Sequence, residues 1–303
     1  MGYRIGFDIG STTIKAVVLD ENNQICYKSY ERHKAQVRQK ALDKLVELKK
    51  YTKEPFKFAI SGSGALGLCE QGELPFVQEV FASATGVSKL YPETDCAIEL
   101  GGEDAKILFF QGSVEQRMNS TCAGGTGAFI DQMATLLNMS LEEMNEASLN
   151  YHRLYPIASR CGVFAKTDIQ PLINQGVDKC DLCASIFQAV VDQTITSLAQ
   201  GRKIEGNILF LGGPLYFLSG LRKRFVETLK LSDAQVNCPE TAINFVALGT
   251  SICADQEYTY DELYKALEDL VHAPAKLTES KPLFESEEDY QKFIERHKSH
   301  DAK

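Results

Sequence analysis

The chain carries the same acidic, glycine-rich pattern twice, and this repeat restricts the possible folds more than any other feature. The stretches FDIGSTTIKAVVL and IELGGEDAKILFF align at a constant offset of 91 residues. An acid, a glycine and a lysine coincide in the alignment: Asp8 with Glu99, Gly10 with Gly101, and Lys15 with Lys106. Because similar elements follow both stretches, the pattern indicates a duplicated domain.

Each copy reads as a β-hairpin followed by a third strand and then by helices. In the first copy we predict strands at 3–8, 13–19, 25–30 and 57–60, and helices at 34–51 and 77–91. In the second copy we predict a third strand at 113–118, a later strand at 208–211, and helices at 124–137, 141–148, 181–199 and 216–229. This mixture places the chain in the α/β class.

The repeat also suggests domain boundaries. We expect a first domain over residues 1–94, completed by a helix at 241–255, and a second domain over residues 95–240. Residues 256–303 are highly charged and read as helical pieces on a linker that leads to a further segment.

Composition excludes several classes of protein. An apolar content of 44% in 303 residues is typical of soluble proteins with two ordinary domains. No stretch approaches the roughly 20 apolar residues of a membrane span, and no leader precedes the first strand. A net charge of -9 without a basic cluster argues against nucleic acid. We therefore expect a cytoplasmic protein with neither membrane nor nucleic-acid partners.

The first hairpin turn has the residue types of a phosphate cradle. Gly10 lets backbone N–H groups approach an anion, and the hydroxyls of Ser11, Thr12 and Thr13 add donors. Asp8 cannot itself favour phosphate, so its expected task is to hold Mg²⁺ between its carboxylate and phosphate oxygens. Taken alone, this motif is better explained as an ordinary hairpin turn, and the phosphate interpretation depends on the second copy.

The second hairpin presents Glu99, Gly101 and Gly102 to the same triphosphate from the opposite side. Lys15 and Lys106 either neutralise phosphate charge or lie solvated on their strands. Three more acids are candidates for work in the cleft: Asp104 and Asp168 for orienting the attacking water, and Glu79 for hydrogen bonding. Each has an alternative role, either as a turn or cap residue or on a solvated helix face.

A third turn, formed by Gly212, Gly213 and Pro214, offers a flat surface for an adenine ring. The two hairpins and this turn together resemble the superfamily of sugar kinases, actin and heat-shock chaperone ATPases. That resemblance implies two ribonuclease-H-like domains that close on ATP. Glu99 stands where aspartate is commoner, which weakens the expectation that it coordinates Mg²⁺ directly.

Two of the nine cysteines lie in unusual surroundings. Cys122 directly precedes a glycine-rich helix start in NSTCAGGTGAFIDQM, and Cys161 precedes a second small turn in ASRCGVF. A helix N-terminus stabilises a thiolate or an anionic cluster, so both positions suit metal ligation. Gly125 and Thr126 in the first helix start are further candidates for nucleotide binding.

With both cysteine segments included, the chain resembles the BadF/BadG/BcrA/BcrD ATPase family over residues 1 to about 255, and most of all its activators of 2-hydroxyacyl-CoA dehydratases. The resemblance implies a homodimer with one [4Fe-4S] cluster, ligated by Cys122 and Cys161 of each subunit. It also implies anaerobic electron transfer driven by ATP. Ferredoxin or flavodoxin would donate the electron, and a CoA-ester dehydratase or reductase would accept it.

Other interpretations remain open. Cys180 and Cys183 form a CxxC pair that could complete a cluster within one chain, although three-residue spacing is also ordinary helix packing. The main functional alternative is a small-molecule kinase such as an N-acetylglucosamine kinase. A second alternative is a non-catalytic ATP-binding scaffold.

Overall fold

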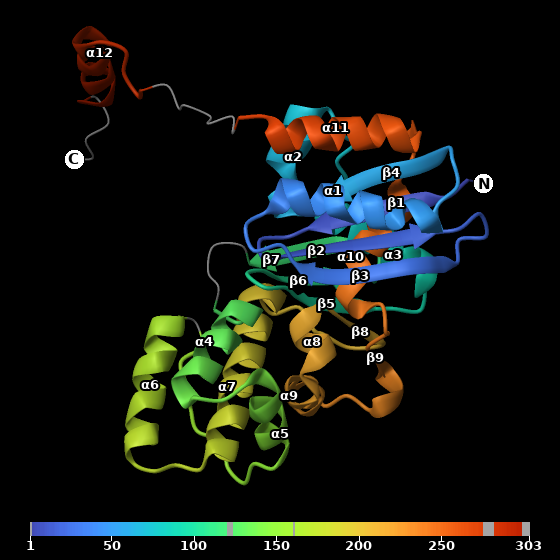
Figure 1. The fold of residues 1–303 in the computed structure, drawn as a ribbon. Coiled ribbons are helices and arrows are strands. Elements are labelled where there is room, and N and C mark those ends of the chain that lie inside the picture. Colours follow the sequence, from blue (N-terminus) through green and yellow to red (C-terminus); the bar gives the residue numbers. More distant parts are fainter. Residues whose placement is uncertain (1, 120–123, 160, 275–281, 299–303) are drawn as a thin grey trace. The chain divides into compact units, whose positions relative to one another are not determined.

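The computed structural model describes residues 2–119, 124–159, 161–274 and 282–298. The chain divides into two compact units, the first ending at Val271 and the second beginning at His272. The first unit contains two five-stranded sheets, one for each copy of the repeat (Figure 1). The second unit contains helix α12 (Glu287–Lys298), which has no buried residue among those described.

The first sheet combines the first repeat with one late strand. It runs in the order β10-β4-β1-β2-β3, with β1 (Arg4–Ile9), β2 (Thr13–Leu19), β3 (Ile25–Arg32), β4 (Phe56–Ser61) and β10 (Glu257–Tyr258). β1 to β3 form an antiparallel meander, and β4 is parallel to β1. β3 is the edge strand, and its residues alternate in exposure, whereas β2 is almost entirely buried.

Helices cover both faces of this sheet (Figure 1). The helical segments of the first half are α1 (Val37–Leu48), η1 (Lys49–Tyr51), η2 (Ser63–Ala65), α2 (Leu66–Gly72), α3 (Glu79–Leu90), α10 (Phe245–Cys253) and α11 (Tyr260–His272). Apolar residues of α1, α2 and α11 share one core with β1 and β4. On the other face, α3 and α10 share a core with β2 and with three strands of the second sheet.

Glycines permit very close backbone packing around α10. A methyl group on Gly6 of β1 would lie 2.2 Å from the carbonyl oxygen of Ala247, and one on Gly249 would lie 2.1 Å from that of Ala82. Any larger side chain would therefore separate α10 from β1 or from α3.

The second sheet repeats the first. It runs in the order β7-β6-β5-β8-β9, with β5 (Cys96–Leu100), β6 (Ala105–Phe109), β7 (Glu115–Asn119), β8 (Ile208–Leu211) and β9 (Val236–Asn237). The acid and the lysine of each repeat are direct cross-strand partners: Asp8 with Lys15 and Glu99 with Lys106. β8 is parallel to β5, as β4 is to β1.

The second half has a helical layer of its own (Figure 1). It comprises α4 (Gly127–Leu137), α5 (Leu141–Leu149), α6 (Gly162–Asn174), α7 (Lys179–Thr194), the π-helical turn η3 (Ile195–Ala199), α8 (Gly213–Phe217), α9 (Ser219–Leu229), η4 (Asp233–Gln235) and η5 (Ala242–Asn244). Among the described residues, one helical stretch, Lys179–Ala199, is long and apolar enough to cross a membrane, but 72% of its apolar window is buried. Its residues belong to the core of this half.

The structure corrects the expected tail. Residues from 256 onward were predicted to be helical pieces on a linker outside the core, yet β10 pairs with β4, and Leu263, Leu267 and Leu270 of α11 are buried in the first core. The high charge of this segment lies on the exposed face of an amphipathic helix, so average composition concealed the apolar stripe. Helix α6 was also missed, since only a small turn was predicted after Cys161.

Candidate active site

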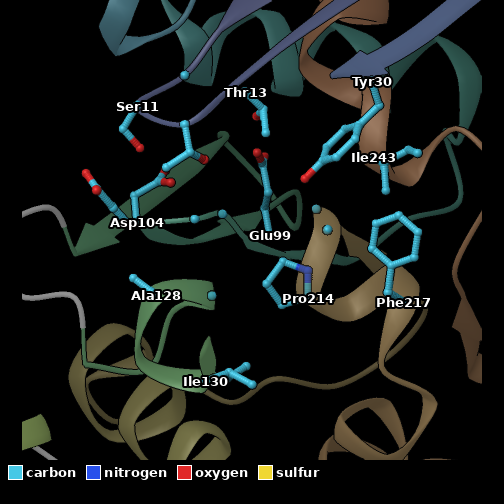
Figure 2. A pocket seen from close by; sticks show the side chains of 18 of the residues that line it. Ser11, Thr13, Tyr30, Glu99, Asp104, Ala128, Ile130, Pro214, Phe217 and Ile243 are labelled. Carbon is cyan, nitrogen blue, oxygen red and sulfur yellow. The ribbon is translucent and has the colours of Figure 1, made fainter. Parts of the chain in front are cut away.

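A cavity of about 710 Å³ lies between the two hairpins and the third glycine turn. Figure 2 shows Ser11, Asp104 and Glu99 from the hairpins facing Pro214 across it. Fourteen residues singled out in the sequence line this cavity: Asp8, Gly10, Ser11, Thr12, Thr13, Lys15, Glu79, Glu99, Gly101, Gly102, Asp104, Gly212, Gly213 and Pro214. The duplicated pattern therefore converges on one site.

The two hairpin turns nearly touch. A methyl group on Gly102 would lie 3.1 Å from the hydroxyl oxygen of Thr12. The strands parallel to β1 and β5 end in equivalent glycines, since Gly62 (φ +98°) and Gly212 (φ +87°) both adopt left-handed backbone. A methyl group at either position would clash with a carbonyl of the neighbouring hairpin strand, at 2.3 and 2.0 Å respectively.

The first acid is paired with its repeat lysine. Lys15 donates to Asp8 over 2.8 Å, and the Asp8 side chain is only 4% exposed. Burial by itself would lower the pKa of Lys15, but the Asp8 carboxylate outweighs burial and raises it. Lys15 therefore stays charged beside the turn that carries Ser11 and Thr12.

The second lysine has a different role from the one considered in the sequence. Lys106 is 2% exposed and does not line the cavity; its ammonium binds Glu79 and lies 2.8 Å from Asp104 and 3.3 Å from Glu99. Burial would lower the pKa of Lys106, but the three carboxylates raise it well above its ordinary value. Lys106 thus holds these acids in place from the protein interior and does not contact a ligand in the cavity.

The acids considered for the chemistry fall into two groups. Asp104 and Glu99 line the cavity, and Ser83 donates to Glu99 over 3.1 Å. A methyl group on Gly101 would lie 2.1 Å from Asp104 Oδ1, so the glycine is required for this carboxylate to fold back on its own turn. Asp168 instead accepts the N–H of Ala158 over 2.8 Å, which is a local structural bond.

Glu79 also lines the cavity, and its pKa is shifted strongly. Burial raises the pKa of Glu79 to about 7, Lys106 opposes that shift, and the carboxylates of Asp8, Glu99 and Asp104 add to it. The solvated helix face considered for Glu79 is therefore wrong, since its side chain is only 22% exposed and faces the other acids.

The raised pKa of Glu79 predicts a pH-dependent stability. The folded state binds this proton more tightly than the unfolded chain, so its stabilisation is complete below about pH 4.5 and is lost as pH rises through 7. Relative to Glu79→Gln, the wild-type free energy of unfolding should fall by on the order of 2 kcal/mol between about pH 5 and pH 8. Urea unfolding of both proteins in a chelating buffer measures this, and parallel pH profiles would contradict it.

One end of the cavity is apolar and was not predicted. Tyr30, Ile243 and Phe217 gather there around Pro214 (Figure 2). The rings of Tyr30 and Phe217 are 6.1 Å apart at 66°, and Phe217 is 56% exposed. Tyr30 and Phe217 are 187 residues apart, so no sequence motif links them. The alternating exposure of β3 could have indicated which face of the sheet Tyr30 occupies, but not that Phe217 and Ile243 lie beside it.

The start of α4 binds the second hairpin. The N–H of Gly127 donates to the carbonyl of Gly101 over 3.0 Å, and that of Ala128 donates to Gly102 over 2.7 Å. Gly127 and Ala128 line the cavity, whereas the candidates Gly125 and Thr126 do not. Thr126 is fully buried, and Gly125 (φ +80°) packs against Gln193, so both shape the turn into α4.

The cysteine segments are only partly described. Cys122 lies outside the described residues, while Cys161 is the N-cap of α6 with a half-buried side chain. Two large apolar residues follow Cys161 in an exposed position, Val163 at 72% and Phe164 at 66%. Within the described ranges, no group of three or more His, Cys, Asp or Glu residues could hold a metal ion.

The rival CxxC pair lies in helix packing. Cys183 is fully buried, with its sulfur 3.9 Å from that of Met139, and burial raises the pKa of its thiol to about 12. The N–H of Cys180 donates to the capping carboxylate of Asp178 over 2.7 Å. Neither the burial nor the high pKa favours a thiolate ligand at Cys183.

Comparison with known proteins finds an ATPase family and dehydratase activators among the relatives of this chain. The sequence pattern of the BadF/BadG/BcrA/BcrD ATPase family matches residues 5–254. The chain is 27% identical over 215 residues to the activating ATPase of (R)-2-hydroxyglutaryl-CoA dehydratase from Acidaminococcus fermentans, covering 70% of this chain and 82% of that protein. It is 29% identical over 217 residues to the activator of lactoyl-CoA dehydratase from Anaerotignum propionicum, covering 70% and 83%.

Two solved structures share the fold. The A. fermentans dehydratase component A superposes with a TM-score of 0.74 at 25% identity, covering 88% of this chain and all of that one. The activator of 2-hydroxyisocaproyl-CoA dehydratase from Clostridium difficile, solved with bound ADPNP, gives a TM-score of 0.73 at 24% identity, covering 92% and all of that chain. The prediction of an α/β fold built from two related halves is confirmed.

Proposed function

Since the chain belongs to the BadF/BadG/BcrA/BcrD ATPase family, we propose that it is an ATPase that activates a CoA-ester dehydratase or reductase by electron transfer. The observation that carries this proposal is the cavity between the two repeated hairpins, where an acid and a glycine turn face the same space from each side. Relatives named as dehydratase activators support the partner class.

The cavity has a polar end and an apolar end that suit ATP. The turns at Gly10 to Thr13 and at Gly101 to Gly102 would bind the phosphates through backbone N–H and hydroxyl groups. Tyr30 and Phe217 would hold the adenine at the other end. Asp8 and Glu99, both nearly buried at the cavity, fit a hydrated Mg²⁺, which would neutralise phosphate charge during hydrolysis.

The surroundings of Cys161 fit a cluster shared between two copies. Its half-buried thiol lies at the N-terminus of a 13-residue helix, and exposed Val163 and Phe164 supply apolar surface beside it. Cys122 and Cys161 from each subunit would hold a [4Fe-4S] cluster, whose chemistry when bound is one-electron transfer. Ferredoxin or flavodoxin would supply the electron, and we place the protein in the cytoplasm.

A direct connection supports coupling of nucleotide to electron transfer. The first N–H groups of α4 bind Gly101 and Gly102, so a nucleotide that displaces this turn also displaces the helix that follows Cys122 in the sequence. The reduction potential of a one-electron carrier changes by about 59 mV for each tenfold difference in nucleotide affinity between its oxidised and reduced states. A few kcal/mol of such differential binding corresponds to on the order of 100–200 mV.

An assay without an acceptor substrate separates the three functional candidates. The anaerobically purified protein should release phosphate from ATP at the same rate with and without N-acetylglucosamine or glucose, because water is the acceptor in the proposed reaction. Phosphate release measured by a coupled assay, with mass spectrometry of the sugar, tests this. A phosphorylated sugar would favour the kinase, and an absence of hydrolysis would favour the scaffold.

A further inference from the structure

His33 is a buried histidine directly after β3, beside the first hairpin turn. It is 4% exposed and does not line the cavity. Two donors of this residue reach the turn: its backbone N–H donates to the carbonyl of Thr12 over 3.2 Å, and its Nε2 lies 3.0 Å from the carbonyl oxygen of Gly10. His33 therefore contacts the carbonyls of the two residues on either side of Ser11, Gly10 and Thr12.

The neighbouring backbone defines the tautomer of the ring. The N–H of Ala35 donates to Nδ1 of His33 over 3.2 Å, so Nδ1 carries a lone pair and no hydrogen. In a neutral imidazole the hydrogen is then on Nε2, which donates to Gly10.

The segment after His33 is strained in a way that maintains this contact. Lys34 (φ +49°) and Ala35 (φ +62°) are consecutive non-glycine residues in the left-handed region, which is unfavourable for both. The turn is closed by a bond of 2.8 Å from the N–H of Gln36 to the carbonyl of His33. This conformation brings the Ala35 N–H onto the ring, and strain of this kind persists only where the surroundings require it.

The contact fixes the orientation of one peptide group. In a trans peptide the C=O and N–H point in opposite directions. Because the Gly10 carbonyl is held towards the buried imidazole, which does not line the cavity, the N–H of Ser11 points away from that imidazole. Gly10 and Ser11 themselves line the cavity. In the second half, the equivalent carbonyl of Gly101 is held by a backbone donor, the N–H of Gly127.

We propose that His33 is a positioning residue that orients the Ser11 N–H as a donor to a nucleotide phosphate. The imidazole holds the carbonyl of Gly10 in the first half, as the N–H of Gly127 at the start of α4 holds the carbonyl of Gly101 in the second. The inference rests on the proposed binding of triphosphate at these turns, and it adds a residue that has no counterpart in the repeat, where position 124 is glycine.

Two substitutions isolate the contact with Gly10. The amide of His33→Gln can reach the place of Nε2 and donate to Gly10, whereas the shorter His33→Asn can accept from Ala35 but cannot reach Gly10. We expect His33→Asn to bind a non-hydrolysable ATP analogue about tenfold more weakly, while its affinity for adenosine is maintained. His33→Gln should recover most of the lost affinity. Isothermal titration calorimetry with both probes measures this.

The possible outcomes are distinct. Equal losses for the ATP analogue and adenosine in His33→Asn, or equal affinities of both variants for the analogue, would overturn the positioning role. A wild-type protein that binds adenosine but not the analogue would overturn the phosphate site itself. Should His33→Asn not fold, nitrogen NMR of the wild-type ring decides, because the inference requires hydrogen on Nε2 and none on Nδ1.

Discussion

Replacing Cys161 by serine is expected to abolish iron binding, from about four iron atoms per dimer to none, while ATP binding is retained. Serine keeps the size of the side chain and removes the thiolate, and a shared cluster that loses this position in both subunits keeps only half of its ligands. The nucleotide cavity does not include Cys161, so ATP affinity should not change. Iron analysis and the brown absorption of anaerobically reconstituted protein measure the effect.

Cys180→Ser provides the matched control. Cys180 is half-buried like Cys161 and also lies at a helix start, but behind the capping carboxylate of Asp178. The shared-cluster proposal requires that its substitution leaves the iron content unchanged. Loss of iron in Cys180→Ser would favour a cluster within one chain, and full iron content in Cys161→Ser would contradict both arrangements.

Lys106→Met is expected to destabilise the protein by about 3 kcal/mol, because nearly buried Glu99 and the partly exposed Glu79 and Asp104 lose their shared counter-charge. Lys106 is 2% exposed and contacts three carboxylates, so its removal leaves Glu79, Glu99 and Asp104 to repel one another. Urea unfolding at neutral pH measures the change in free energy. The loss should shrink as the pH is lowered and these carboxylates become protonated.

The duplication supplies the control for this prediction. Lys15→Met removes the equivalent lysine, which is 17% exposed and, among the described residues, forms an ion pair only with Asp8. This substitution should lower the free energy of unfolding by about 1 kcal/mol, since only the charge of Asp8 loses its partner and the ion pair is partly solvated. If both substitutions cost the same, the three-acid cluster around Lys106 does not carry the stability assigned to it.

The sequence predicted the parts of the molecule that depend on local pattern. The offset of 91 residues places Asp8 opposite Lys15 and Glu99 opposite Lys106, and both hairpins have this register. Strand 208–211 was predicted with the bounds it has. Alternating hydrophobicity and glycine turns are local signals, which explains this success.

Features that depend on contacts distant in sequence were not predicted. Tyr30 meets Phe217 only because β3 is the edge strand nearest α8, and no spacing encodes that meeting. The burial of Lys106 beneath the cavity likewise depends on Glu79, which comes from a helix of the other half. The buried face of α11 was masked by its charged positions, and His33 carried no motif at all.

The return of the chain to its first half has a consequence for synthesis. The second half is contiguous from Cys96 to Asn237, whereas the first sheet and its cores need α10, β10 and α11, which follow residue 244. A nascent chain on the ribosome can therefore form both the sheet strands and the helical layer of its later half while its earlier half still lacks a strand and two helices. The face of the second sheet that packs against α10 is covered only at that late stage. The first sheet therefore acquires β10 and the helices α10 and α11 only after the chain up to residue 244 has been synthesised.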